Sequence, residues 1–133
     1  MKYLIIYLSF LSVPFLAQGY EFSVVDTRLT AQGKAAFDRN CAACHSHGYG
    51  NDGKKYKPAV LALQIKYKGA LSPYIEERTE LNADVLGVFI RNGVKSMPPF
   101  RKTEVSDADI KAIAAYIAEL VKKAVVEKAK SNK

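Results

Sequence analysis

The sequence predicts an all-α fold, and two observations carry that prediction. Apolar residues recur at helical spacing in three segments, whereas no segment shows the convincing alternation of a half-buried strand. The chain has 133 residues, which is the length of one domain. A domain of three or four short helices has little apolar surface to bury, so it often needs a further component in its core.

The N-terminal segment has the layout of a secretory signal peptide. Lys2 precedes an apolar run from Tyr3 to Ala17, and small residues at Ala17 and Gly19 suit a cleavage site. The alternative is an uncleaved membrane anchor, but a spanning helix needs about 20 apolar residues and Pro14 interrupts this shorter run. We therefore divide the chain into a signal peptide (1–19), an N-terminal lead (20–29), a main domain (30–122) and a Lys-rich C-terminal tail (123–133).

The first helix is expected from about Ala31 to Arg39. Thr30 is its N-cap candidate, because a threonine hydroxyl accepts a hydrogen bond from an orphan amide at a helix start. Alanines and Phe37 give the segment a small apolar face. This helix leads the chain directly into Cys41.

The second helix is expected from about Ala83 to Asn92. Asn82 suits its N-cap, and Gly93 suits its end. Its buried stripe is expected to consist of Val85, Leu86, Val88, Phe89 and Ile90.

The third helix is the clearest. Residues 106–109, "SDAD", resemble a capping box with Asp in place of Glu. Helical spacing then relates Ile110, Ile113, Ala114, Ile117, Leu120 and Val121. The helix is expected to continue to about Lys128, before a solvated tail. Between the first two helices, residues 45–58 form a Gly-rich loop, and short helices are compatible with 61–69 and 72–78.

Residues 41–51, "CAACHSHGYGN", hold every cysteine and histidine of the chain. A structural zinc site commonly takes two pairs of ligands, and a second pair is missing here. A thiol–disulfide exchanger is typical of a βαβ context, which the all-α pattern does not provide. The order C-x-x-C-H is the attachment signature of haem c. Cys41 and Cys44 would form thioethers to the two vinyl groups, and His45 would bring its imidazole beneath the iron.

The second axial ligand of such a haem is predicted to be Met97. This methionine lies 52 positions after His45, in a loop stiffened by Pro98 and Pro99 rather than on an apolar helical stripe. Ligation by His and Met is a known haem c pairing and raises the reduction potential. His47 follows His45 too closely to reach the opposite face, so it is interpreted as a loop residue near the haem edge.

On these motifs the chain resembles the class I monohaem cytochromes c, from Gly33 to about Leu120. Gly33 and Phe37 match the family's N-terminal helix, and Tyr116 matches the aromatic residue of its C-terminal helix. The resemblance implies three to five short helices wrapped around one covalent haem c. It also implies that the carbonyl of Pro58 accepts the Nδ1 proton of His45. Lys57 stands where the family often has glycine.

Residues 89–120 are similar to the cytochrome subunits of p-cresol methylhydroxylase-type flavocytochromes and to stand-alone periplasmic cytochromes. This resemblance implies a periplasmic carrier of single electrons from a dehydrogenase, such as a flavoprotein, to a downstream respiratory acceptor. With both axial positions filled the protein is expected not to be an enzyme. A haem enzyme or gas sensor with a dissociable Met97 and a haem-free thiol oxidoreductase are the alternatives.

The formal net charge is +7, which suits an acidic protein face or an anionic membrane surface. Export argues against nucleic acid as a partner, and no membrane span is expected after signal cleavage. Tyr67 and Arg78 are candidates for contacts to the haem propionates. A basic rim that would steer acidic partners is expected from Lys54, Lys55, Lys57, Lys66, Lys68, Lys95, Arg101 and Lys102.

Overall fold

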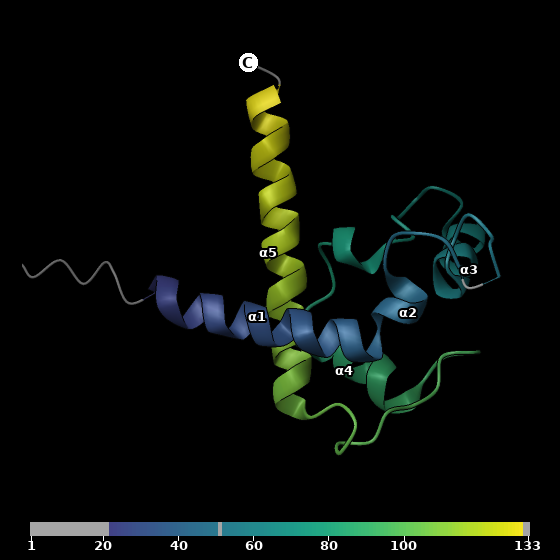
Figure 1. Ribbon diagram of the computed structural model, residues 1–133, viewed down its shortest axis with the longest axis horizontal. Helices are drawn as coiled ribbons and strands as arrows, with labels where there is room; N and C mark the ends of the chain where they lie inside the picture. The colour runs from purple at the N-terminus through teal and green to yellow at the C-terminus, as the bar shows by residue number, and fades with distance from the viewer. Residues whose placement is uncertain (1–21, 51, 132–133) are drawn as a thin grey trace, which may run out of the picture.

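A computed structural model describes residues 22–50 and 52–131 (Figure 1). Its elements are α1 (Phe22–Asn40), α2 (Ala42–His45), α3 (Pro58–Tyr67), the 3-10 helix η1 (Ile75–Glu77), α4 (Ala83–Asn92) and α5 (Asp107–Ser131). The described residues contain no strand, only an isolated bridge between Val94 and Met97, so the all-α prediction is confirmed. No helix in these ranges is long and apolar enough to cross a membrane. The predicted signal peptide, residues 1–19, lies outside the described residues.

The fold is organised by the crossing of α1 over α5 (Figure 1). Gly33 lies at the contact, where an added Cβ would stand 2.5 Å from the carbonyl carbon of Ala112 and 2.9 Å from Cβ of Tyr116. One turn further along α1, the rings of Phe37 and Tyr116 meet with centroids 5.5 Å apart and planes tilted by 51°. The absent side chain of Gly33 therefore lets the helix backbones approach, and the aromatic pair fills the space beside them.

The hydrophobic core lies beneath this crossing, where α1, α4 and α5 meet. Its buried members come from these helices and the segments beside them: Ala36, Phe37, Leu81, Leu86, Ile90, Val105, Ile110, Ile113, Tyr116 and Ile117. Cys41 and Met97 pack against this cluster although they are only partly buried. Both ends of the candidate haem site therefore rest on the same core.

The first helix is longer than its predicted range. It begins at Phe22, so Thr30 lies within the helix and the N-cap prediction is wrong. Residues 22–40 contain no proline, and their one glycine lies at position 33, so nothing in this segment stops the helix from extending through Thr30. The stretch 20–29, which the sequence assigned to an N-terminal lead, is therefore helical from Phe22 onward.

The second predicted helix has the expected ends. The Asn82 side chain accepts a hydrogen bond from the Val85 amide at 3.0 Å, and Gly93 ends α4 with φ +66°. Its buried stripe is narrower than predicted, because only Leu86 and Ile90 are buried. Val88 and Phe89 are 59% and 40% exposed. Phe89 shares a cavity wall with Leu86 and Ile90, whereas Val88 turns away from that face of the helix.

The capping box that begins α5 is confirmed. The Ser106 hydroxyl accepts from the Asp109 amide at 3.0 Å, while the Asp109 carboxylate accepts from the Ser106 amide at 3.1 Å. The helix runs on to Ser131, which corrects the predicted tail after Lys128. Ala, Glu and Lys dominate this exposed end and are strong helix formers. Figure 1 shows the C-terminal half of α5 projecting past the crossing with α1.

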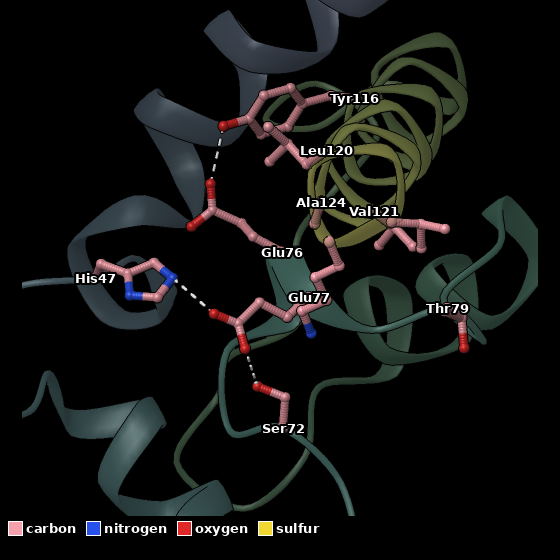
Figure 2. Close-up of a pocket in the computed structure, with 11 residues that line it drawn as sticks. His47, Ser72, Glu76, Glu77, Thr79, Tyr116, Leu120, Val121 and Ala124 are labelled. Carbon is pink, nitrogen blue, oxygen red and sulfur yellow. Dashed lines mark hydrogen bonds and ion pairs between the residues drawn. The ribbon is translucent and has the colours of Figure 1, made fainter. Parts of the chain in front are cut away.

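Two neighbouring glutamates of η1 bind side chains of α5 and of the loops on either side of α3 (Figure 2). Glu76 accepts a hydrogen bond from the Tyr116 hydroxyl at 2.8 Å. Burial and this carboxylate raise the pKa of Tyr116 above its ordinary value. Glu77 accepts from the Ser72 hydroxyl at 2.7 Å and pairs with His47 at 3.2 Å. Because Ile75 precedes this pair, both contacts hold the segment that lines the cavity described next.

Candidate functional site

A largely apolar cavity brings the predicted haem ligands together. Cys41, His45 and Met97 line it, although Met97 is more than fifty positions from the other two. The remaining lining residues come from α3, η1, α4, α5 and the segments beside them: Leu63, Lys66, Tyr67, Ile75, Arg78, Leu81, Leu86, Phe89, Ile90, Val94 and Ile113. A pocket with apolar walls and a few convergent polar groups is typical of a cofactor site.

The cysteine–histidine motif folds as one helical turn, α2, at the end of α1. The Cys41 amide donates to the Phe37 carbonyl at 2.8 Å, which continues the hydrogen bonding of α1. The His45 amide then donates to the Cys41 carbonyl at 2.9 Å. Cys41 is partly buried and lines the cavity, whereas Cys44 is exposed. The turn therefore places the first thiol and the imidazole at one wall.

The protonation chemistry of this turn suits a haem anchor better than a thiol exchanger. Burial raises the pKa of the Cys41 thiol to about 11, with a further contribution from Cys44. A thiol–disulfide exchanger needs a lowered thiol pKa, so this environment argues against that alternative. Burial also lowers the pKa of His45, which favours the neutral imidazole that binds metal.

One atom of the turn lacks a partner. Within residues 22–50 and 52–131, Nδ1 of His45 is buried and makes no hydrogen bond. A buried imidazole nitrogen needs a hydrogen-bond partner, so this Nδ1 is the atom for which an orienting acceptor is expected. The proposed acceptor, Pro58, is exposed and begins α3. The Pro58 carbonyl does not accept a hydrogen bond from Nδ1 in this structure, so its role toward His45 stays a prediction.

The loop that carries Met97 is tightly held against the end of α4. Val94 and Met97 exchange two backbone hydrogen bonds of 3.0 and 2.9 Å, and the Phe100 amide donates to the Ile90 carbonyl at 2.7 Å. An added Cβ on Gly93 would stand 2.6 Å from the Met97 carbonyl oxygen, and its φ of +66° also favours glycine. The loop therefore has little freedom to move its thioether.

Arg91 is a further anchor of this loop that sequence patterns do not reveal. Its guanidinium donates to the Phe100 carbonyl at 3.1 Å and to the Asp107 carboxylate at 2.7 Å. Lys102 also donates to Asp107 at 2.7 Å. These hydrogen bonds lower the pKa of Asp107 to about 2. The start of α5 and the end of α4 thus clamp the loop between them.

Replacing Arg91 with methionine is expected to weaken this clamp. The free energy of unfolding should fall by about 1 kcal/mol, because the hydrogen bond to the partly buried Phe100 carbonyl is lost while the Asp107 pair is screened by solvent. Asp107 has a folded-state pKa below its unfolded value, so its contribution is present above about pH 4 and is lost as the pH falls toward 2. This acid-dependent part should shrink in the variant. Urea unfolding between pH 2 and 6 measures both effects, with Asp107→Asn as the control. If the free energy of unfolding changes equally with pH in wild type, Arg91→Met and Asp107→Asn, the account is wrong.

His47 lies outside the residues that line the cavity. Its ring stacks on Tyr74 with centroids 3.8 Å apart, and its Nε2 pairs with Glu77 (Figure 2). More than half of its side chain is exposed. These contacts join the loop after α2 to η1 and to the residue before it. They support the interpretation of His47 as a loop residue.

Arg78 and Tyr67 bring polar groups to the cavity wall. The Arg78 guanidinium lies 4.8 Å from the centroid of the Tyr67 ring, and its side chain is only 10% exposed. It also pairs with Glu80. The nearby arginine lowers the pKa of the Tyr67 hydroxyl. A cation held beside an apolar cavity in this way is suited to a carboxylate of a bound group.

The predicted basic rim is smaller than the sequence suggests. Lys54 and Lys102 pair with Asp52 and Asp107 at 2.9 and 2.7 Å, and Arg101 pairs with Glu104 at 3.3 Å. Lys57 is turned toward the backbone of α2. The remaining members of the rim are Lys55, Lys66, Lys68 and Lys95.

Comparisons with known proteins agree with the geometry of this site. Residues 28–117 match the family model described as "Cytochrome C oxidase, cbb3-type, subunit III". Cytochrome c6 of Synechocystis sp. is 34% identical over 107 residues, which cover 77% of this chain and 77% of that relative. Cytochrome c6 of Cladophora glomerata is 33% identical over 93 residues, which cover 70% of this chain and 90% of the relative. No solved structure matches the chain significantly.

Proposed function

Because this chain belongs to the c-type cytochrome family, we propose that it is a periplasmic carrier of single electrons from a dehydrogenase to a downstream respiratory acceptor. Family membership makes it an electron-transfer protein with one covalently attached haem c, rather than an enzyme. The single observation that carries the proposal is that Cys41, His45 and Met97 line one apolar cavity.

We assign the cofactor contacts residue by residue. Cys41 and Cys44 would hold the haem through thioethers, and His45 and Met97 would be the axial ligands of its iron. The carbonyl of Pro58 is the proposed acceptor for Nδ1 of His45, which would orient the imidazole. Arg78 and Tyr67 are the proposed contacts to the propionates. When bound, the haem iron supplies a one-electron couple between its ferric and ferrous states.

The chain's own residues set the properties of that couple. The paired thioether and imidazole leave no axial position for oxygen or substrate. The apolar walls from Leu86, Ile90 and Ile113 keep water from the site, and low polarity disfavours the more highly charged ferric state. The tight loop around Met97 keeps the thioether in place. Together these features favour a carrier of high potential.

A positive charge at the cavity suits contact with a redox partner. Lys66 is exposed and lines the cavity, with its Nζ 5.0 Å from the Tyr67 ring. A positive charge at the edge of the site suits a partner with an acidic rim, which would be steered by charge and released quickly.

For the donor we propose a flavin-dependent dehydrogenase of the p-cresol methylhydroxylase type. This choice rests on the resemblance drawn from the sequence of residues 89–120 alone. Location in the periplasm rests on the layout of residues 1–19, whose removal would show in the mass of the exported protein. If no flavin-dependent dehydrogenase reduces this cytochrome, the proposed donor is wrong.

Carbon monoxide tests whether the protein is a carrier or a gas-binding haem protein. The dithionite-reduced holoprotein is expected to show no change in its spectrum under carbon monoxide, because both axial ligands come from the protein. It should also titrate reversibly with one electron per haem. Rapid binding of carbon monoxide by the wild type would instead favour a sensor or enzyme with a dissociable Met97.

The donor is tested by mixing the oxidised cytochrome with a purified para-alkylphenol-oxidising flavoprotein and its substrate. The haem is expected to be reduced, at a rate that falls with ionic strength. Lys66→Gln should slow the reaction at low salt, whereas Lys130→Gln, at the far end of α5, should not. Absence of reduction with this donor would exclude it without changing the evidence for the haem site.

A further inference from the structure

We propose that Lys57 is a positioning residue for the axial histidine and that its charge raises the reduction potential of the site. The inference rests on the proposed function, because it takes His45 as an axial ligand. Lys57 differs from the other lysines near the cavity in where its ammonium group lies. Its side chain is partly buried and turned inward, whereas Lys54, Lys55, Lys66 and Lys68 are exposed.

The Lys57 ammonium joins two points on either side of His45. Its Nζ donates to the Ala42 carbonyl at 2.8 Å and to the Ser46 hydroxyl at 2.6 Å. The Ser46 hydroxyl in turn donates to the same Ala42 carbonyl at 2.8 Å. Ala42 is the first residue of α2 and Ser46 follows its last residue, so the three groups close a ring around the end of this turn.

The backbone of Lys57 has a second role at the start of α3. Its carbonyl accepts from the Leu61 amide at 3.0 Å, and it is the residue that immediately precedes α3. One residue therefore caps the beginning of α3 with its backbone and holds the end of α2 with its side chain. Pro58, the proposed acceptor for His45, is the next residue, so the same contact fixes the chain that carries it.

The haem-binding turn depends on such a tie. It contains four residues, and a single helical turn is not stable by itself in water. Within the described chain, its N-cap Cys41 makes no side-chain capping bond. The carbonyl end of a helix also favours a positive group, and the ammonium of Lys57 occupies that end. The turn that carries the imidazole is thus held through Ala42 by a lysine fifteen positions further along the chain.

The charge of Lys57 predicts the direction of its effect on the potential. A positive charge held near the axial ligand favours the ferrous state, which carries one positive charge fewer than the ferric state. Because Lys57 is partly buried and fixed by two hydrogen bonds, salt screens it less than an exposed lysine. Lys55 offers a matched control, since it carries the same charge two positions away, is exposed and has its Nζ 5.4 Å from the Tyr56 ring.

The test compares the holoproteins of wild type, Lys57→Met, Lys57→Arg, Ser46→Ala and Lys55→Met. We expect Lys57→Met to shift the equilibrium with a fixed one-electron reference couple roughly tenfold toward the ferric form, which corresponds to about 59 mV. Lys55→Met should shift it less than about twofold. The reduction potential of Lys57→Arg should stay close to that of the wild type. Ser46→Ala should alter the Soret circular dichroism and change the reduction potential little.

Denaturant unfolding of the same proteins separates positioning from stability. Equal potentials and equal Soret circular dichroism for Lys57→Met and Lys55→Met would overturn the inference, even if Lys57→Met unfolds more easily. If Lys57→Met does not assemble, Lys57→Gln replaces it, because glutamine also removes the charge while keeping a hydrogen-bond donor. A fall in potential for Lys57→Gln no larger than that for Lys55→Met, with wild-type Soret dichroism, would overturn the inference equally. A wild-type protein that lacks covalent haem would overturn both this inference and the proposed function.

Discussion

Replacing Gly33 with alanine is expected to destabilise the protein by about 3 kcal/mol or more, the range of severe core overpacking. The added methyl group would overlap the Ala112 carbonyl group, lying 2.5 Å from its carbon, and would also crowd Tyr116. These neighbours are backbone and a Cβ atom, which cannot turn aside as the end of a flexible side chain would. The α1–α5 crossing would have to open, which would also separate Phe37 from Tyr116.

Gly87 provides the matched control for this prediction. It lies within α4, and an added Cβ there meets no atom within 4 Å. Gly87→Ala is therefore expected to raise the free energy of unfolding by about 0.5–1 kcal/mol, because alanine has the better helix propensity. Urea unfolding of the two variants measures the contrast. Equal stability of Gly33→Ala and wild type would show that the crossing is looser than described.

Replacing Met97 with alanine is expected to have the largest effect on function. The axial thioether is lost, and a weaker ligand such as water would take its place. The reduction potential should fall, with a shift of roughly tenfold or more in the equilibrium with a reference couple, or about 59 mV or more. The reduced variant should also bind carbon monoxide, whereas the wild type is expected not to bind it. Potentiometric titration and a carbon monoxide difference spectrum measure these effects.

Two further variants separate ligation by Met97 from damage to its loop. Met97→His should again exclude carbon monoxide while keeping a low potential, since a nitrogen ligand replaces the thioether. His47→Ala removes the other histidine without touching the cavity and should leave potential and carbon monoxide response as in the wild type. Carbon monoxide binding by reduced His47→Ala would show that His47, and not Met97, is the second axial ligand.

Local sequence signals predicted those parts of the fold that local chemistry decides. Asn82 and Gly93 mark the two ends of α4 because a side-chain cap and a left-handed glycine act over a few residues. The prediction that Thr30 caps the first helix is wrong, because a residue able to cap a helix is also tolerated inside one. Phe89 could not be placed by its helical spacing alone, because whether it faces a core or a cavity depends on the fold.

The candidate site divides in the same way. The sequence predicts the C-x-x-C-H motif and Met97 as candidate ligands, because haem attachment needs a motif of that spacing and a thioether on a stiff loop. Lys57 and Arg91 were not, because each is a long side chain whose partners are set by the tertiary fold. The sequence places Lys57 in the basic rim expected to steer acidic partners, and only its hydrogen bonds to Ala42 and Ser46 distinguish it from Lys55. No pattern in the sequence marks such contacts.

The oxidised absorption spectrum of the holoprotein, recorded beside that of Met97→Ala, tests the central claim most directly. Ligation by a thioether gives ferric haem c a weak long-wavelength charge-transfer band. The wild type is predicted to show this band and the variant to lack it, with the covalent haem present in both. Coinciding spectra would show that Met97 is not the ligand, and the account of a His45–Met97 electron carrier would then be wrong.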